Sequence, residues 1–187
     1  TEKVVITAPS DIMEDILVDN VDGKVFIHFK PNMNISAKNI AAKVFVRDFT
    51  HLEATSAAKI LVKDKFTQDK TDVEVSSSGR ITGNLEANDF SVDVSSSGYF
   101  SGEIWAVNLD AEATSSGDIN LSGKAKNAAL KASSAGTVDA GKLTAEISDI
   151  QASSAGNVTV ATTNQLNASA SSGGNIAVYR KGNLHIV

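Results

Sequence analysis

The residues whose spacing could support chemistry are carboxylates that recur at nearly constant intervals: Glu53, Glu74, Asp93 and Glu112. Each stands second in a repeated short phrase, and later phrases carry Lys131, Gln151 and Ser169 at this position. If the phrases stack as strands, the carboxylates form a file about 4.8 Å apart, and like charges so placed destabilise a sheet. The file predicts a site for a divalent cation or a basic partner at Glu74, Asp93 and Glu112. The alternative is a solvated face screened by salt and nearby lysines.

Catalytic motifs are sparse. Ser56 and Lys59 match the Ser-x-x-Lys spacing of penicillin-binding enzymes, but that motif requires the start of a helix, which a repeat corner does not provide. The histidines, His28, His51 and His185, lie far apart without metal-ligand spacing and are interpreted as surface or cap residues. We find no set of acids with Lys, Arg or His that would share one groove, so we predict no catalytic residue and no cofactor.

Two aromatic residues break the pattern of the repeats. Other repeats place polar residues at the position of Tyr99: Arg80, Asp118, Thr137 and Asn157. Trp105 likewise stands where the preceding repeat carries Glu86. Exposed aromatic side chains on a flat β surface can stack on sugars or anchor a protein. We predict a binding role for Tyr99 and Trp105; packing under residues 63–72, or a self-association contact, would explain them equally well.

All of these residues lie in or beside a repeated segment of the sequence, and the fold of that repeat decides where they stand. Phrases of the type "VEVSSSGRI" align on Gly79, Gly98, Gly117, Gly136, Gly156 and Gly174, at spacings of 19, 19, 19, 20 and 18 residues. A fixed period near 20 indicates a stacked repeat. Each unit is too short for two helices and holds three short apolar-inward segments separated by tight turns. The pattern predicts an all-β, single-stranded parallel β-helix with about 19–20 residues per rung, right-handed as parallel crossovers usually are.

The second serine of the phrase is the same in every unit: Ser77, Ser96, Ser115, Ser134, Ser154 and Ser172. Strand parity predicts that this serine points inward at a corner where only a small side chain fits. The glycine two positions later suits a turn with positive φ. We therefore interpret these serines and glycines as structural corner residues.

Residues 1–50 are less regular than the rest. The segment "ILVDNVDGKVFIHF" predicts a β-hairpin around Asp22-Gly23. We expect residues 1–50 to form N-terminal strands, this hairpin and irregular first rungs that cover the open end of the coil. Residues 51–187 should form regular rungs of the same continuous domain. The charged segment 63–72 is predicted to be a loop inserted before these rungs.

Composition narrows the classes of function. Of 187 residues, 42% are hydrophobic but only 5% aromatic, so the core must be built from Val, Ile, Leu and Ala. The net charge of −5 and the scattered lysines and arginines exclude a typical nucleic-acid binder. The absence of cysteine excludes disulfides and Cys-ligated zinc. No apolar run reaches the roughly 18 residues that span a bilayer. Because Thr1 already lies in a strand-like segment, we expect a targeting segment upstream.

The repeated phrases also resemble a known family. The "SSSG" and "SSGD" phrases at a period near 19, the segment "VDGKVFIHF…AAKVFV" before them and the closing "YRKGN" are similar to the autotransporter-adhesin head family, the GIN-domain proteins of bacterial envelopes. The resemblance covers most of the chain. It implies a right-handed β-helix exported beyond the inner membrane, with an adhesin-like role and no catalytic residues to carry over.

Three functions remain open at this point. The first is a non-catalytic adhesin or scaffold domain in the cell envelope (periplasm, outer membrane or cell surface) that binds an unknown protein or glycan through its long faces. The second is an enzyme acting on polysaccharide, since β-helices host such enzymes and fold does not decide function. The third is a scaffold that polymerises end to end through its open edges. We favour the first.

Overall fold

A computed structural model describes residues 1–36, 38–180, 182 and 185–186. The chain divides into two compact units, Thr1–Arg47 and Asp48–Val187. Within the described residues there is no α-helix, and the helical element is the single 3₁₀ turn η1, Met13–Asp15. Residues 181 and 183 of the closing "YRKGN" lie outside the described residues.

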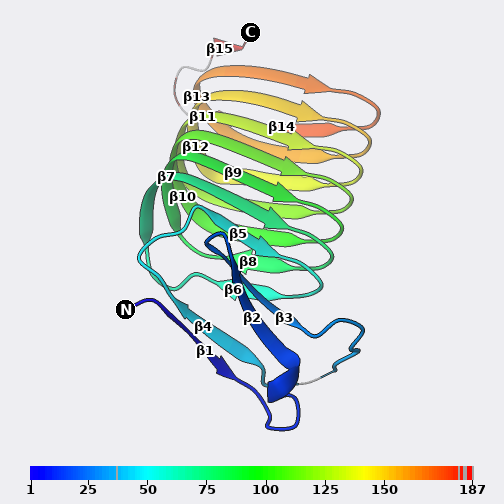
Figure 1. Cartoon of the computed structure of the whole chain (residues 1–187). Coiled ribbons are helices and arrows are strands. Elements are labelled where there is room, and N and C mark those ends of the chain that lie inside the picture. Colours follow the sequence, from blue (N-terminus) through cyan, green and yellow to red (C-terminus); the bar gives the residue numbers. More distant parts are fainter. Residues whose placement is uncertain (37, 181, 183–184, 187) are drawn as a thin grey trace. The chain divides into compact units, whose positions relative to one another are not determined.

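The first unit consists of two antiparallel pairs (Figure 1). Strand β1, Lys3–Thr7, pairs with β4, Ala41–Phe45. Strand β2, Ile16–Val21, pairs with β3, Lys24–Phe29, through a two-residue turn in which Asp22 and Gly23 have φ of 51° and 79°. The predicted hairpin is thus confirmed. No described residue of this unit is buried, so the unit has no core of its own.

The second unit is a parallel β-solenoid of about seven turns, which confirms the predicted fold class (Figure 1). Its strands are β5 (His51–Ala54), β6 (Lys59–Leu61), β7 (Phe66–Val75), β8 (Arg80–Thr82), β9 (Leu85–Val94), β10 (Tyr99–Ala113), β11 (Asp118–Ala132), β12 (Thr137–Ala152), β13 (Asn157–Ala170), β14 (Asn175–Arg180) and β15 (His185–Ile186). Each long strand pairs in parallel with the equivalent strand of the next turn; β10 and β11, for example, pair with a constant offset of 19 residues, from Tyr99↔Asp118 to Ala113↔Ala132.

The core follows from the alternation of side chains along each strand. In β10 the inward residues Phe100, Ile104, Leu109, Ala111 and Ala113 are buried, and the residues between them face outward or are partly covered. Phe90 and Phe100 are buried in this core, with ring centroids 6.2 Å apart, and the partly buried Phe49 and Phe66 pack against it. Between β10 and β11 each inward residue therefore stacks on its equivalent in the neighbouring turn. The register shifts once where β11 pairs with β12 and twice where β12 pairs with β13, but one core cluster still runs along the unit.

The serine corners differ from the sequence-based expectation. The second serine of each phrase is exposed, not inward, and it shares a turn with the residue after it. In the Thr114–Gly117 turn, Ser115 and Ser116 have φ of 48° and 61°, and the Gly117 N–H donates to the Thr114 carbonyl at 2.8 Å. Positive φ at both central positions is the signature of a type I′ turn. Strand parity fails here because the chain leaves the extended conformation before the second serine.

The role of the corner glycine also differs. Gly117 does not have positive φ; the two preceding residues do. Instead, a Cβ on Gly117 would collide with the main-chain carbonyl of Val94 in the preceding turn. Gly79, Gly136, Gly156 and Gly174 meet an equivalent carbonyl in the same way. The glycine is required by close approach between backbones, and not by its own conformation.

The turns continue the hydrogen-bond ladder of the strands around the corner. The Ser97 N–H donates to the Ser115 carbonyl of the next turn at 3.1 Å, and the Ser116 N–H donates to the Ser134 carbonyl at 3.0 Å. Left-handed conformations at two successive residues direct these amides along the axis of the stack. The corner therefore stabilises the solenoid through its backbone, and its exposed side chains only need to be small enough to stack.

The segment 63–72 was expected to be a loop, and for residues 66–72 this is wrong. Strand β7 begins at Phe66 and pairs along its length with β9, from Phe66↔Leu85 to Val75↔Val94. Thr67, Asp69 and Lys70 are exposed on this strand, whereas Gln68 is half-buried and Thr71 and Val73 are buried. Tertiary pairing overrides a composition that looks unstructured when read alone.

Replacing Gly117 by Ala should destabilise the solenoid by about 2–4 kcal/mol, because neither backbone can move away without breaking the ladder. Urea unfolding followed by circular dichroism would measure the loss. Ser116→Ala, one residue away, is the matched control and should change the free energy of unfolding by less than about 0.5 kcal/mol. Ala135 and Ala155 already occupy that turn position, with φ of 61° and 60°. Equal stability of the two variants would contradict the close-approach account.

Candidate functional site

The predicted acidic file exists. Pairing of β5, β7, β9 and β10 places Glu53, Glu74, Asp93 and Glu112 directly opposite one another in that order. The same column continues through Lys131, Gln151 and Ser169. Glu53, Glu74 and Asp93 are exposed and Glu112 is half-buried, so the file lies on the outer surface. The structure brings together side chains that are about 20 residues apart in the chain, as the repeat predicts.

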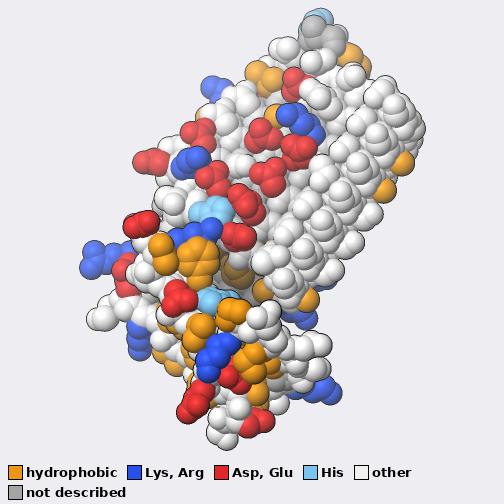
Figure 2. All heavy atoms as spheres, turned by 45° about the vertical axis from the view of Figure 1, so that its right-hand side comes forward, with side chains coloured by type: hydrophobic (Ala, Val, Ile, Leu, Met, Phe, Trp, Pro, Cys, Tyr) orange, Lys and Arg blue, Asp and Glu red, His pale blue; other side chains and the backbone are white. Residues whose placement is uncertain are grey.

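Two further outward columns run beside the file. One contains His51, Asp72, Ser91, Asp110, Ala129 and Asp149, and the other contains Lys70, Asp89, Asn108 and Asn127. The three columns together are called the acidic face below. Figure 2 shows the carboxylates gathered on this side of the solenoid.

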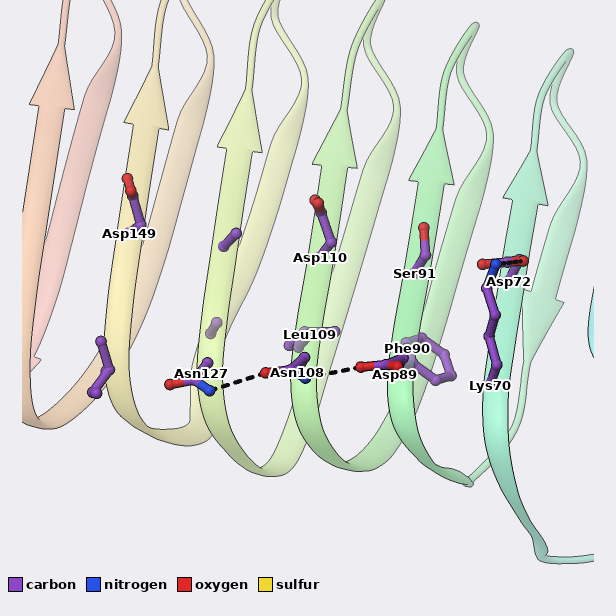
Figure 3. A pocket seen from close by; sticks show the side chains of 13 residues that line it. Lys70, Asp72, Asp89, Phe90, Ser91, Asn108, Leu109, Asp110, Asn127 and Asp149 are labelled. Atoms are coloured by element: carbon purple, nitrogen blue, oxygen red, sulfur yellow. Dashed lines mark hydrogen bonds and ion pairs between the residues drawn. The ribbon is translucent and has the colours of Figure 1, made fainter.

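The acidic face is hollowed where the strands bend, in a depression of about 400 Å³ lined by Asp72, Asp89, Asp110 and Asp149 among others (Figure 3). Along its floor, the Asn108 Nδ2 donates to Asp89 Oδ1 at 2.8 Å, and the Asn127 Nδ2 donates to Asn108 Oδ1 at 2.9 Å. Each of these two amides thus donates to the side chain at the same position in the preceding turn, so the hydrogen bonds link three successive turns along the hollow.

The hollow corrects one expectation from the sequence. Acids do share a groove with a cation: Lys70 lines the hollow and pairs with Asp72, with Nζ and Oδ2 3.1 Å apart. Lys70 and Asp72 are two residues apart on one strand, but the other carboxylates of the hollow come from later turns, at separations of about 19 residues or multiples of it. The signal in the sequence was the pair of outward columns two and four residues before the acidic file.

Negative charge is concentrated on the acidic face, and it affects the pKa of the Asp93 carboxyl. Partial burial raises the pKa of the Asp93 carboxyl above its ordinary value, and the carboxylates of Glu112, Asp110, Glu74 and Asp72 raise it further. These neighbours belong to both carboxylate columns. The face therefore carries a negative potential that favours cations.

Trp105 lies on a different outward column, between Glu86 and Lys124 of the neighbouring turns. Its side chain is 46% exposed. The Lys124 Nζ lies 5.1 Å from the ring centroid, and Glu86 is engaged by Lys65, with Oε2 and Nζ 2.9 Å apart. Val107, two residues further along the same strand, is also exposed. The predicted outward position of Trp105 is confirmed by this register and exposure.

The Tyr99 side chain is less accessible to a ligand than the Trp105 side chain. It is half-buried, and the Arg80 guanidinium lies 4.1 Å from its ring centroid. Arg80 and Asp118 flank Tyr99 in the neighbouring turns, as the repeat predicts. The two aromatic residues belong to separate columns, and each is paired with its own cation. The structure does not show them forming one surface.

The sequence analysis missed one residue of interest. His51 was interpreted as a surface or cap residue, but it begins β5 and stands two residues before Glu53, so both side chains point to the same face. One ligand atom each of His51, Glu53 and Glu74 lies within 4.8 Å of the others. Alternation within the strand together with the repeat period could have revealed this group.

Comparisons with known proteins identify the family. The family described as "Putative auto-transporter adhesin, head GIN domain" matches residues 1–182. The chain belongs to this family. No curated protein matches the head GIN-domain chain.

Solved structures share its fold. A crystal structure described as "a putative adhesin from Parabacteroides merdae ATCC 43184" is 20% identical, with a TM-score of 0.77 over 98% of this chain and 82% of that chain. A "putative adhesin" from Bacteroides fragilis NCTC 9343 is 18% identical, with a TM-score of 0.66 over 100% and 82%. A "Putative lipid binding protein from Parabacteroides distasonis ATCC 8503" is 16% identical, with a TM-score of 0.72 over 98% and 83%.

These identities establish the fold of the head GIN domain and leave its ligand open. Among the described residues, no helix combines the length and the apolar character that crossing a bilayer demands.

Replacing Asp93 by Asn should stabilise the solenoid at pH 7 by about 0.5 kcal/mol, or roughly 1–2 °C in melting temperature. A raised pKa means that the folded state holds the proton more tightly than the unfolded state. The free energy of unfolding therefore falls as pH rises through the pKa of Asp93. The difference between variant and parent should vanish below about pH 4. Asp149→Asn, whose register neighbours Ala129 and Asn167 are uncharged, is the control. A destabilised Asp93→Asn protein at pH 7 would contradict this account.

Proposed function

We propose that this chain is an adhesin-like domain of the cell envelope that binds a surface glycan through the outward column containing Trp105. The observation that carries the proposal is the exposed indole, which stands in a column whose neighbours are polar and charged. A large apolar side chain left exposed on a regular polar surface is the kind of anchor that binding surfaces use.

The strands hold this anchor in a fixed place. Trp105 lies inside β10, which is paired on both sides along its length. A ligand that stacks on the indole would not have to order a mobile loop, so little conformational entropy is lost on binding. Val107 extends the apolar surface along the same strand. The flanking Glu86, Lys124 and Lys65 supply donors and acceptors for hydroxyl groups.

Lys124 would have to move for a sugar to use the ring face that it covers. An exposed cation–π contact of this kind contributes only about 0.5–1 kcal/mol. The Lys124 side chain is exposed and can swing aside. We therefore expect the contact to reduce the affinity for a glycan slightly and not to prevent binding.

The location and the non-catalytic character rest on the family. The matching family and two of the similar structures are described as adhesins, which supports a role outside the inner membrane. Antibody labelling of intact cells, followed by fractionation of the envelope, tests the location. Recovery of the native protein in the cytosol alone would contradict it.

A polysaccharide-acting enzyme is the second candidate, because the hollow of the acidic face holds Lys70 with several carboxylates. Incubation of the purified chain with acidic and neutral polysaccharides, with assay of new chain ends, tests this candidate. Activity that disappears in Asp110→Asn would support the enzyme and would place the chemistry away from Trp105. Absence of turnover would favour the binding domain.

Trp105→Ala should reduce binding to glycans found on an array by about 10-fold or more, because hot-spot aromatics contribute about 2 kcal/mol or more and about 1.4 kcal/mol is tenfold in affinity. Calorimetry with the purified chain measures the change. Thr67→Ala is the matched control, since Thr67 is exposed in the same column two turns away. Unchanged affinity in a folded Trp105→Ala protein would overturn the proposed site. Tyr99→Ala should have the smaller effect, because Arg80 already covers its ring.

A further inference from the structure

A mixed group of ligating side chains lies at the start of the acidic face. His51 and Glu53 project from the same face of β5, and the register sets Glu53 directly opposite Glu74 of β7. The ligand atoms of His51, Glu53 and Glu74 all lie within 4.8 Å of one another. One imidazole and two carboxylates converge here from two paired strands.

The His51 imidazole gives a second, independent indication that this group of side chains binds a ligand. The Nε2 atom of His51 is closed off from solvent and has no hydrogen-bond partner in the described part of the chain. Glu53 Oε2 lies 3.7 Å from it, within reach of an ion pair with a protonated imidazole but beyond hydrogen-bond distance. Buried polar atoms are nearly always paired, since each unpaired one costs about 1–3 kcal/mol. The orphan nitrogen faces two carboxylates, which is the arrangement that a bound cation would satisfy.

The charge of the surroundings favours a cation at the same place. Beyond Glu74 the file continues through Asp93 and Glu112. Carboxylates placed directly opposite one another on paired strands repel each other. A divalent ion at the head of the file would offset the repulsion.

We propose that His51, Glu53 and Glu74 bind one divalent ion of the zinc class. Zinc takes imidazole nitrogen together with carboxylate oxygen, whereas calcium and magnesium prefer oxygen ligands alone. In a tetrahedral site with bonds of ~2.1 Å the ligand atoms lie about 3.4 Å apart. The exposed side chains of Glu53 and Glu74 can close the remaining distance by changing rotamer.

The three ligands would leave a fourth position open to the outside. A ligand atom from a bound partner could fill it, so the ion could serve as a contact point on the acidic face. This site is independent of the Trp105 column, and each can be tested without the other.

The test is a titration of the chelator-treated full chain with zinc chloride, by calorimetry and by thermal melting. We expect one equivalent of zinc to bind and to raise the melting temperature, because a ligand that binds only the folded state stabilises it. His51→Gln and Glu74→Gln should each weaken binding by at least about 10-fold. His28→Gln is the matched control and should bind as the parent does; His28 Nε2 is paired with Asp19 Oδ2 at 2.7 Å in the first unit. Circular dichroism of the metal-free variants establishes that they fold.

Cobalt(II) provides a second measurement. Substitution should give the intense visible absorption of a tetrahedral nitrogen–oxygen site in the parent and not in His51→Gln. Absence of zinc binding, or equal binding by the parent and His51→Gln, would overturn the proposal. So would an equal rise in melting temperature with calcium that is lost in Asp93→Asn but retained in His51→Gln, because the ion would then be held by the carboxylate file alone.

Discussion

The in-register pairing of parallel strands, one turn on the next, is the constraint on which the second unit depends. The pairing runs along β10, β11 and much of β12, with a register shift at Asn120–Ser122 where β11 meets β12. It continues through the corners, where amides of left-handed serines donate to the carbonyls of the next turn. No turn of a solenoid buries its inner face alone, so stability accumulates between neighbours. A substitution that separates two turns at a corner, as at Gly117, acts on the whole stack because of this dependence.

The same pairing converts a repeat in sequence into columns in space. An inward column must remain small and apolar, which explains the Val, Ile, Leu and Ala core around Phe90 and Phe100. An outward column has no such restriction, but each of its members lies directly opposite its equivalents. Asparagines so placed hydrogen-bond to one another, as Asn108 and Asn127 do. Carboxylates so placed repel one another, as at Asp93.

Structures only 16–20% identical share the fold over nearly the whole chain. The backbone ladder and a small apolar interior tolerate many sequences, while the outer columns are free to differ. Function in such a fold belongs to the residues that interrupt a column. In this chain the indole of Trp105 and the imidazole of His51 are such residues, and we propose binding roles for both.

The sequence by itself determined the period, the parallel solenoid, the hairpin at Asp22-Gly23 and the order of the acidic file. All of these follow from spacing and alternation, which can be read along the chain before any strands have paired. Only the tertiary structure decided the rest. The corner serines take left-handed conformations and the glycines avoid a carbonyl of the preceding turn. Residues 66–72 form a strand, Lys70 enters a hollow with carboxylates, and His51 meets Glu53 and Glu74. Each of these depends on a distance between two turns, and such a distance exists only once the backbones have paired.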